Sequence, residues 1–287
     1  MNILITGGTG FVGRRLIERL HTRHSLAVIS RSNKKAIFLE GSGVKVYYGD
    51  ISDKNFVLES SRGADCVIHL AATFAPGKAM KDNLIFMRNV ISAALGNGIK
   101  KLIFMSSINS KFGKQGPYSL SKRLCEEEVL RSGLDYVILR PGLIYDDRGG
   151  IFISQLLKFI KKFNFAPIIG TGEYRMQPIH VDDVVSITEK VLFSHRERTY
   201  DLFGPDIFTY NLLAEMIFDK LSVKKRVKIH IPLGLLRLIG PFFNITNDKI
   251  LEIDENKTGD PEALRREFGI PLVELKTRLN LIINNLS

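Results

Sequence analysis

The sequence has few cysteines, and their spacing points to neither a metal site nor a disulfide framework. Its 287 residues contain only Cys66 and Cys125, with no Cys-x-x-Cys pair. Both lie in apolar or helical patterns, so we expect two buried, reduced thiols and no bound metal. This cysteine usage is typical of a reducing compartment, and we expect a cytoplasmic location.

Long apolar runs and long basic runs are also missing. No uncharged stretch reaches the length of about 18 residues that a membrane-spanning helix needs, and the first residues do not resemble a signal peptide. We expect no stable membrane insertion, although peripheral contact with a membrane stays open. The net charge of +11 favours anionic partners. Because no run of five basic residues occurs, we expect no nucleic-acid partner; the oligomeric state is left open.

The chain does contain a regular alternation of short apolar runs and helical patterns. The apolar runs predict strands at residues 2–6, 26–30, 44–50, 65–72, 100–107 and 135–142. Helical patterns follow at 13–23, 54–63, 83–98 and 118–133. Nearly continuous apolar strands are expected where helices cover both faces of a sheet. The sequence therefore predicts an α/β fold with a doubly wound parallel sheet of the Rossmann type.

A glycine-rich loop joins the first predicted strand to the first predicted helix. The stretch TGGTGFVG places Gly7, Gly10 and Gly13 in a GxxGxxG spacing. Gly7 permits a tight turn, Gly10 leaves room for a pyrophosphate, and Gly13 lets the helix pack closely. Backbone N–H groups at the start of the helix then face the phosphates. We therefore predict a dinucleotide site formed by Gly7, Thr9, Gly10, Phe11, Val12 and Gly13.

The end of the second strand lacks the carboxylate that an NAD-binding protein usually places there. The chain instead reads SRSNKK from Ser30, and Arg31 can form a forked pair with a 2′-phosphate. NADP(H) is therefore favoured as the cofactor, with NAD(H) as the alternative. We expect further cofactor contacts after the third and fourth strands, from Asp50, Ile51, Leu70, Ala71 and Ala72.

The rhythm of the sequence changes after about residue 150. We assign residues 1–150 to a dinucleotide-binding Rossmann domain, to which parts of 176–205 return. Most of 151–287 is assigned to a smaller, mostly helical substrate or C-terminal lobe. Helical patterns are expected there at 151–162, 209–221 and 232–243.

A candidate catalytic group follows the fifth predicted strand. Tyr118 and Lys122 are spaced i, i+4 and share one face of a helix. A Lys122 cation can stabilise the phenolate of Tyr118, which makes Tyr118 a candidate general acid or base. Ser106 and Ser107 end the strand, at the edge of the sheet where ligands bind in this architecture. We favour Ser107 as the hydroxyl that contacts substrate, and Ser106 stays open.

These motifs together resemble the extended or atypical branch of the short-chain dehydrogenase/reductase superfamily. The resemblance covers essentially the whole chain and depends on TGGTGFVG, GDISD, HLAAT, SS followed by YSLSK, LRPGLIY and PIHVDDVV. The short interval between Ser107 and Tyr118 is similar to that of the atypical group containing the dehydrogenase-like accessory subunit of respiratory complex I. The resemblance implies that Lys122 also holds the nicotinamide ribose and that Arg140, Pro141 and Gly142 border the nicotinamide. It further implies that His180 and Asp182 order the lobe, with His180 in a structural role.

The sequence is compatible with three functions. The first is an NADP(H)-dependent oxidoreductase acting on a carbonyl or carbinol substrate, in which Ser107, Tyr118 and Lys122 are catalytic. The second is a nucleotide-sugar epimerase or dehydratase, whose diphosphate ligands would come from Arg148, Lys158, Arg175 and Arg237. The third is a non-catalytic NADP(H)-binding subunit or assembly factor of a quinone or respiratory system. The substrate is a small molecule that the sequence does not name: a carbonyl compound, a nucleotide sugar or a quinone-like compound.

Overall fold

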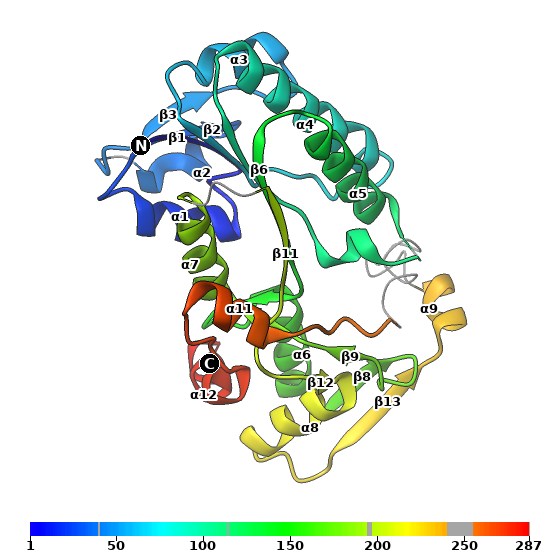
Figure 1. The fold of residues 1–287 in the computed structure, drawn as a ribbon. Helices are drawn as coiled ribbons and strands as arrows, with labels where there is room; N and C mark the ends of the chain where they lie inside the picture. The colour runs from blue at the N-terminus through cyan, green and yellow to red at the C-terminus, as the bar shows by residue number, and fades with distance from the viewer. Residues whose placement is uncertain (40, 114, 194–196, 240–254, 287) are drawn as a thin grey trace. The chain divides into compact units, whose positions relative to one another are not determined.

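The computed structural model describes residues 1–39, 41–113, 115–193, 197–239 and 255–286, and Figure 1 shows the chain as a ribbon. The chain divides into two compact units. The first contains Met1–Phe112, Pro117–Arg140 and Val184–Asp201, and the second contains Gly113–Gly116, Pro141–Asp183 and Leu202–Ser287. Each unit is described separately.

The first unit is built on a seven-stranded sheet with the order β11-β6-β5-β4-β1-β2-β3. Its strands are β1 (Asn2–Thr6), β2 (Ser25–Ser30), β3 (Lys45–Tyr48), β4 (Cys66–His69), β5 (Lys101–Met105), β6 (Asp135–Pro141) and β11 (Arg198–Leu202). The strands from β1 to β6 pair in parallel. The order 3-2-1-4-5-6 is that of dinucleotide-binding sheets. The predicted α/β class with a doubly wound parallel sheet is therefore confirmed.

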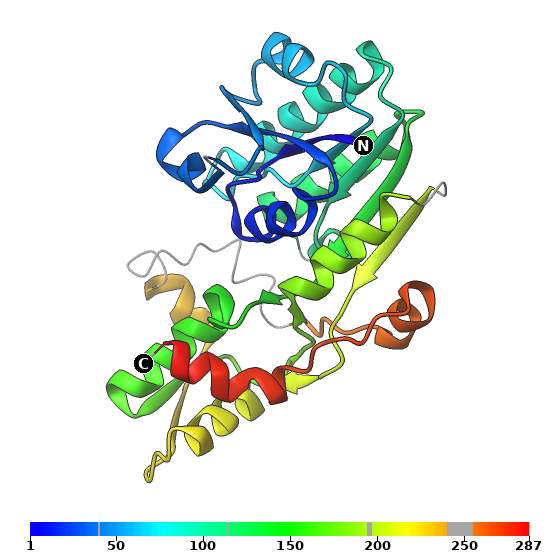
Figure 2. The same ribbon diagram turned by 90° about the vertical axis from the view of Figure 1, so that its left-hand side faces the viewer.

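Helices cover both faces of this sheet. They are α1 (Phe11–Leu20), α2 (Asn33–Ala36), α3 (Lys54–Ser60), α4 (Ala79–Gly96), α5 (Pro117–Leu130) and the part of α7 (Val181–Val191) that belongs to this unit. Residues of α3, α4 and α5 share one hydrophobic cluster with the strands. Arg19 of α1 and Arg23, which follows α1, both pair with Glu189 of α7. These ion pairs join the end of α1 to α7, and Figures 1 and 2 show the two helices.

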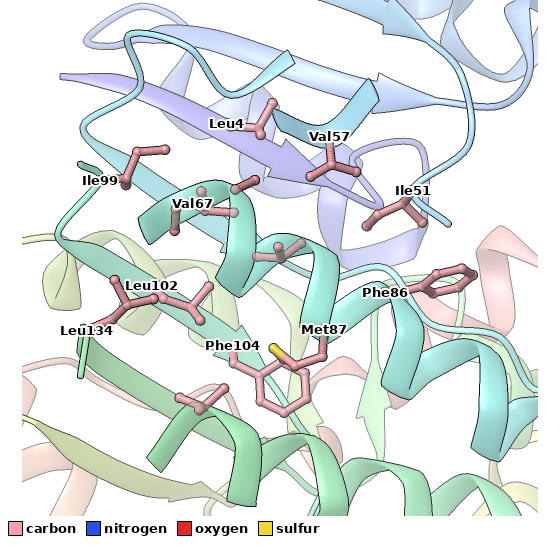
Figure 3. Packing of buried hydrophobic residues seen from close by; sticks show 14 of the residues in the cluster. Leu4, Ile51, Val57, Val67, Phe86, Met87, Ile99, Leu102, Phe104 and Leu134 are labelled. Atoms are coloured by element: carbon pink, nitrogen blue, oxygen red, sulfur yellow. The ribbon is translucent and has the colours of Figure 1, made fainter. Parts of the chain in front are cut away.

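The core of the first unit lies between the sheet and helices α3 to α5. Leu4, Val67 and Leu102 come from three neighbouring strands, and Met87 of α4 packs in the same cluster (Figure 3). All four side chains are at most 1% exposed. Full burial of an aliphatic side chain contributes about 1.5–3 kcal/mol. This core fixes the strand ends on which the candidate site is built.

In the part that the structure describes, the second unit combines helices with three pairs of short strands. The helices are α6 (Gly150–Phe163), α8 (Tyr210–Lys220), α9 (Leu233–Ile239), α11 (Pro261–Phe268) and α12 (Leu275–Asn285). The strand pairs are β7 (Ile144–Tyr145) with β10 (Ile179–His180), β8 (Phe165–Ile169) with β13 (Val227–Ile231), and β9 (Arg175–Met176) with β12 (Phe208–Thr209). Its core is formed mainly by α6, α8, α12 and β8. The last four residues of the helix expected at 232–243 lie outside the described residues.

The cysteines and the hydrophobicity of the helices were both subjects of sequence-based expectations. Cys66 and Cys125 are free and buried, and burial raises the pKa of each thiol to about 12. Among the helices that the structure describes, none is both long and apolar enough to cross a membrane.

Candidate active site

The glycine loop turns tightly against the end of β4. Gly7 has a φ of +74°, and a Cβ placed on it would lie 2.6 Å from the backbone nitrogen of Ala71. A Cβ on Gly13 would lie 2.4 Å from the carbonyl oxygen of Gly7. At Gly10, such a Cβ would meet the Gly7 oxygen, at 3.1 Å, and no other described atom beyond its chain neighbours and its own helix within 4 Å. Gly7 and Gly13 are thus required by backbone packing, while Gly10 leaves one side of the loop open.

A fourth glycine in the loop has a role that the GxxGxxG spacing does not reveal. A Cβ on Gly8 would lie 2.8 Å from Val28 of β2 and 2.9 Å from Ile17 of α1. Gly8 therefore lets the loop pass between the sheet and its first helix. The sequence did contain a signal for this role, because residues 7 to 13 include four glycines and the GxxGxxG spacing accounts for only three of them.

The start of α1 is suited to an anion. Gly10 is the N-cap residue and supplies no side-chain cap, and no acidic residue lies in the first turn. The first N–H groups of a helix have no partner within the helix, and the helix dipole favours negative charge there. Phe11 is 46% exposed and Val12 is half-buried at this end. The predicted loop residues are therefore gathered around one uncapped helix N-terminus, which fits a pyrophosphate.

Arg31 extends from the end of β2 into solvent. Its side chain is 68% exposed, and its guanidinium is 3.9 Å from the carboxylate of Asp50. The other oxygen of that carboxylate accepts the backbone N–H of Ser52, at 2.8 Å. Ile51, in contrast, lies in the hydrophobic core and is only 5% exposed. Arg31 and Asp50 are thus accessible to a ligand, while the Ile51 side chain packs inward.

A second arginine lies beside the loop and was not singled out by the sequence. Arg14 follows Gly13 directly, and its side chain donates to the carbonyls of Thr9, at 3.2 Å, and Lys35, at 3.4 Å. Its guanidinium lies 4.4 Å from the ring centroid of Phe38. Arg14 therefore ties the glycine loop to the segment that follows Arg31.

The ends of β1 and β4 meet at the point where the strand order reverses. The hydroxyl of Thr6 and Nδ1 of His69 are 2.7 Å apart. Burial, with a smaller contribution from Lys122, lowers the pKa of His69 to about 3, so its imidazole is neutral at physiological pH. The residues that follow, Leu70, Ala71 and Ala72, are half-buried. In sheets of this kind ligands bind outside this switch point.

Tyr118 and Lys122 lie on the same face of α5, as predicted from their spacing. The Nζ of Lys122 donates to the carbonyl oxygen of Met105, at 2.7 Å, and lies 5.8 Å from the ring centroid of Tyr118. Lys122 is only 3% exposed, and burial lowers its pKa to about 8. At pH 7 it therefore remains mostly charged, with little solvent to screen it from the neighbouring tyrosine.

The two serines at the end of β5 differ in their surroundings. Ser106 is 3% exposed and donates its hydroxyl to the carboxylate of Glu126. Ser107 is half-buried, and its hydroxyl oxygen accepts the backbone N–H of Asn109, at 3.3 Å. The Ser106 hydroxyl is thus engaged inside the protein, and Ser107 is the serine with partial access to solvent.

Glu126 organises the polar interior behind these serines, a role that sequence reasoning missed. It is 3% exposed and accepts hydrogen bonds from Ser106, from Ser110 at 2.7 Å, and from Nε of Arg140 at 2.9 Å. Nη1 of the same guanidinium lies 3.6 Å from the carboxylate of Asp201. Its i, i+4 spacing from Lys122 was the available signal, because it places Glu126 on the same face of α5.

The remaining residues implied by the family resemblance belong to the second unit. The N–H of Gly142, next to Pro141, donates to Leu202, at 3.0 Å, and a Cβ on Gly142 would lie 3.3 Å from the Gln177 carbonyl oxygen.

Two of the diphosphate ligands suggested for an epimerase or dehydratase, Lys158 and Arg175, are exposed. The backbone of Arg148 donates to Asp146, at 2.9 Å. The side chain of Arg237 lies outside the described part of the chain.

His180 is fully buried in the second unit. Its Nδ1 accepts the backbone N–H of Asp182, at 3.3 Å, and its Nε2 is 3.5 Å from the Asp147 carboxylate. Tyr145 packs edge-on against the ring, with centroids 5.0 Å apart. Burial lowers the pKa of His180. These contacts are those of a packing residue.

Asp183, next in this motif, is held in an environment that disfavours its charge. Its carboxylate accepts the N–H of Val273, at 2.9 Å, and burial raises its pKa to about 6. Because the pKa of Asp183 is raised on folding, the free energy of unfolding falls as pH rises from about 4 to about 6. Asp183→Asn keeps an acceptor for Val273, so we expect its unfolding free energy to exceed that of the wild type by about 1–2 kcal/mol at pH 7.

Urea unfolding of both proteins between pH 4 and pH 7.5 measures this difference. The difference between the two curves should shrink toward pH 4, where Asp183 is protonated in the folded protein and about half protonated in the unfolded chain. A constant gap across the whole range would contradict the explanation, because it would not depend on ionisation.

Residues 3–202 match the model of the NAD dependent epimerase/dehydratase family, and the chain belongs to that family. One relative is the NADH dehydrogenase [ubiquinone] 1 alpha subcomplex subunit 9, mitochondrial, of Arabidopsis thaliana, 27% identical over 80% of this chain and 60% of that protein. Another is the 2-alkyl-3-oxoalkanoate reductase of Stenotrophomonas maltophilia, 28% identical over 64% of this chain and 62% of that protein. The chain thus spans about three fifths of the length of these relatives.

Solved structures support the fold. The UDP-glucose 4-epimerase of Thermotoga maritima, solved with UDP-glucose, superposes with a TM-score of 0.79. That match covers 99% of this chain and 98% of the epimerase, at 20% sequence identity. The predicted resemblance to the extended short-chain dehydrogenase/reductase group is confirmed by the family match.

Proposed function

We propose that this protein is an NADP(H)-dependent oxidoreductase that interconverts a carbonyl compound and its alcohol. The observation that carries the proposal is the buried Lys122 cation, fixed by Met105 at 5.8 Å from the Tyr118 ring. A bound NADPH would supply the hydride that adds to the carbonyl carbon and would leave as NADP⁺. Tyr118 would donate the proton to the carbonyl oxygen, and Ser107 would orient that oxygen by a hydrogen bond. The product is the alcohol, and Tyr118 regains its proton from solvent.

Lys122 would act in two ways. Its charge favours the phenolate form of Tyr118 after proton transfer, which lowers the cost of that step. As in the family that the sequence resembles, its ammonium would also hold the nicotinamide ribose. The direct test follows NADPH consumption at 340 nm with a panel of aldehydes and ketones. Activity that Lys122→Met removes supports the proposal, whereas turnover that survives in Lys122→Met contradicts it.

Cofactor preference provides a separate test. The exposed Arg31 guanidinium can pair with a 2′-phosphate, and no carboxylate ends β2 to hold a 2′-hydroxyl. We expect NADPH to bind at least about tenfold more tightly than NADH, because a charge-assisted contact is worth about 1.5–3 kcal/mol. Arg31→Ala should remove most of that preference. Fluorescence titration with both cofactors measures it.

Arg62→Ala is the matched control for this titration. Arg62 has the same side-chain exposure as Arg31, 68%, but pairs with Glu59 on α3. The Arg62→Ala substitution should leave the affinities for NADPH and for NADH unchanged. Equal affinity of the wild type for NADPH and NADH would contradict the assignment of Arg31 to the 2′-phosphate.

One alternative is favoured by a specific finding. The Arabidopsis relative is named as a subunit of NADH dehydrogenase, which supports a non-catalytic NADP(H)-binding subunit or assembly factor. Such a protein would bind NADPH but reduce no carbonyl compound at any pH. An epimerase or dehydratase would instead convert a nucleotide sugar without net consumption of the cofactor. The same NADPH assay, run beside chromatography of UDP-glucose, separates the three functions.

A further inference from the structure

An exposed phenylalanine lies directly on the candidate catalytic tyrosine. Phe74 follows β4 by five residues and is 66% exposed. Its ring stacks on that of Tyr118, with centroids 4.2 Å apart and an angle of 24° between the planes. An offset-stacked aromatic pair is worth about 0.5–1.5 kcal/mol. Most of the Phe74 ring nevertheless remains accessible, beside the residue to which we assign proton transfer.

The backbone on both sides of Phe74 is held in place. The side-chain amide of Asn83, which is 3% exposed, accepts from the N–H of Thr73, at 2.8 Å, and donates to the carbonyl of Thr73, at 3.1 Å. On the other side of Phe74, the N–H of Ala75 donates to the Thr73 hydroxyl, at 3.1 Å. The exposed ring is therefore carried by a fixed loop.

The same asparagine ties this loop to the catalytic helix. Asn83 also donates to the hydroxyl of Ser121, at 2.9 Å, and that hydroxyl donates to the backbone carbonyl of Tyr118, at 2.6 Å. One buried amide thus fixes the residue before Phe74 and, through Ser121, the turn that carries Tyr118. The stack is a preorganised feature of the site, which reduces the entropy cost of binding against it.

We propose that Phe74 is the floor of a substrate subsite for a planar, apolar carbonyl compound, such as an aromatic or conjugated aldehyde or ketone. The proposal rests on the proposed oxidoreductase function and names its substrate class. A carbonyl whose oxygen reaches Tyr118 places its nearest substituent beside Phe74. Phe74 offers apolar area and a π face but no hydrogen bond, so a planar apolar group gains contact there.

A sugar is poorly matched to the same surface. The ring of a nucleotide sugar carries hydroxyls on the carbons next to the reacting one. Placed against Phe74, a hydroxyl would lose water without gaining a partner, and each such loss costs about 1–3 kcal/mol. Phe74 would therefore give a planar aromatic carbonyl compound a more favourable contact than a sugar whose hydroxyls meet the ring.

The experiment compares wild type, Phe74→Ala, Phe74→Leu and Phe193→Leu with NADPH and two substrates, 9,10-phenanthrenequinone and butanal. Phe193 is the control because it is similarly exposed, 62%, in the same unit. We expect Phe74→Ala to raise KM for the quinone about tenfold and KM for butanal less than twofold, with little change in NADPH affinity and the same change in kcat for both substrates. For Phe74→Leu, KM for the quinone should lie between those of the wild type and Phe74→Ala. For Phe193→Leu, both KM values should equal those of the wild type.

The outcomes separate the subsite from the function. Equal effects of Phe74→Ala on both substrates, or a wild type that turns over UDP-glucose in preference to the quinone, would overturn the subsite. If the wild type reduces no carbonyl compound, the oxidoreductase proposal fails. The subsite is then judged by saturation-transfer NMR of 9,10-phenanthrenequinone with NADP⁺ present. Binding that Phe74→Ala removes supports the subsite, whereas binding retained by the variant, or none to the wild type, overturns it.

Discussion

Tyr118→Phe is expected to lower kcat for carbonyl reduction by at least about 100-fold, because general acid–base catalysis typically contributes 10²–10⁴-fold. The substitution removes only the hydroxyl. The remaining ring can still stack on Phe74 at 4.2 Å and stay near the Lys122 ammonium. We therefore expect the melting temperature and the NADPH affinity to remain near those of the wild type. Stopped-flow single turnovers with saturating NADPH measure the loss at the chemical step.

Tyr136→Phe is the matched control for this measurement. Tyr136 is a half-buried tyrosine of β6 that packs against the core of the same unit. Its substitution should leave kcat unchanged. A Tyr118→Phe enzyme that retains near-normal kcat would exclude Tyr118 as the acid or base, and would leave the cofactor-binding subunit as the better explanation of the fold.

The sheet could be predicted because its strands are buried on both faces. Residues 2–6, for example, were expected as a strand from their apolar run, and β1 covers the same residues. The periodic apolar face of the stretch 83–98 likewise predicted α4, which begins four residues earlier, at Ala79. Patterns of this kind record burial, so they locate the elements that form a core.

The second unit was harder to predict because its strands are short. β7, β9, β10 and β12 contain two residues each, which is too few for an alternating pattern to appear. The β8–β13 pair joins residues more than 60 apart in the chain, such as Phe165 and Val227. Pairing of that kind is set by tertiary packing, and no local signal announces it.

The candidate site was predicted as residue types at strand ends, while its supporting contacts were not. The spacing of Tyr118 and Lys122 predicted a shared face, but it did not indicate that Lys122 would donate to Met105. Phe74 had no signal in its own residue type, because an exposed aromatic looks the same in the sequence as a buried one. Its position became informative only when Asn83 and Ser121 were seen to hold it over Tyr118.

Glu126→Ala is expected to lower the unfolding free energy by about 3 kcal/mol, because it leaves the partly buried Arg140 with only the more distant carboxylate of Asp201, at 3.6 Å. The Glu126 side chain is 5% exposed and that of Arg140 is 21% exposed. Without the carboxylate, the hydroxyl of Ser106 also loses its acceptor, while that of Ser110 keeps the carbonyl oxygen of Ser107, at 2.7 Å. The loss is a large part of the 5–15 kcal/mol that stabilises a typical domain. Urea unfolding followed by circular dichroism measures it.

Glu128→Ala, two residues along the same helix, is the control that separates burial from charge. Glu128 pairs with Arg88 at the surface, with side-chain exposures of 30% and 59%, so its removal should cost about 0.2–1 kcal/mol. Replacing both Glu126 and Arg140 by Met should recover part of the stability lost in Glu126→Ala, because apolar side chains replace the ion pair, although the buried Ser106 hydroxyl still lacks its acceptor. Asp201 keeps Lys111 as its partner in that double variant, at 2.5 Å. If Glu126→Ala cost no more than Glu128→Ala, the buried carboxylate would not be the centre of this network.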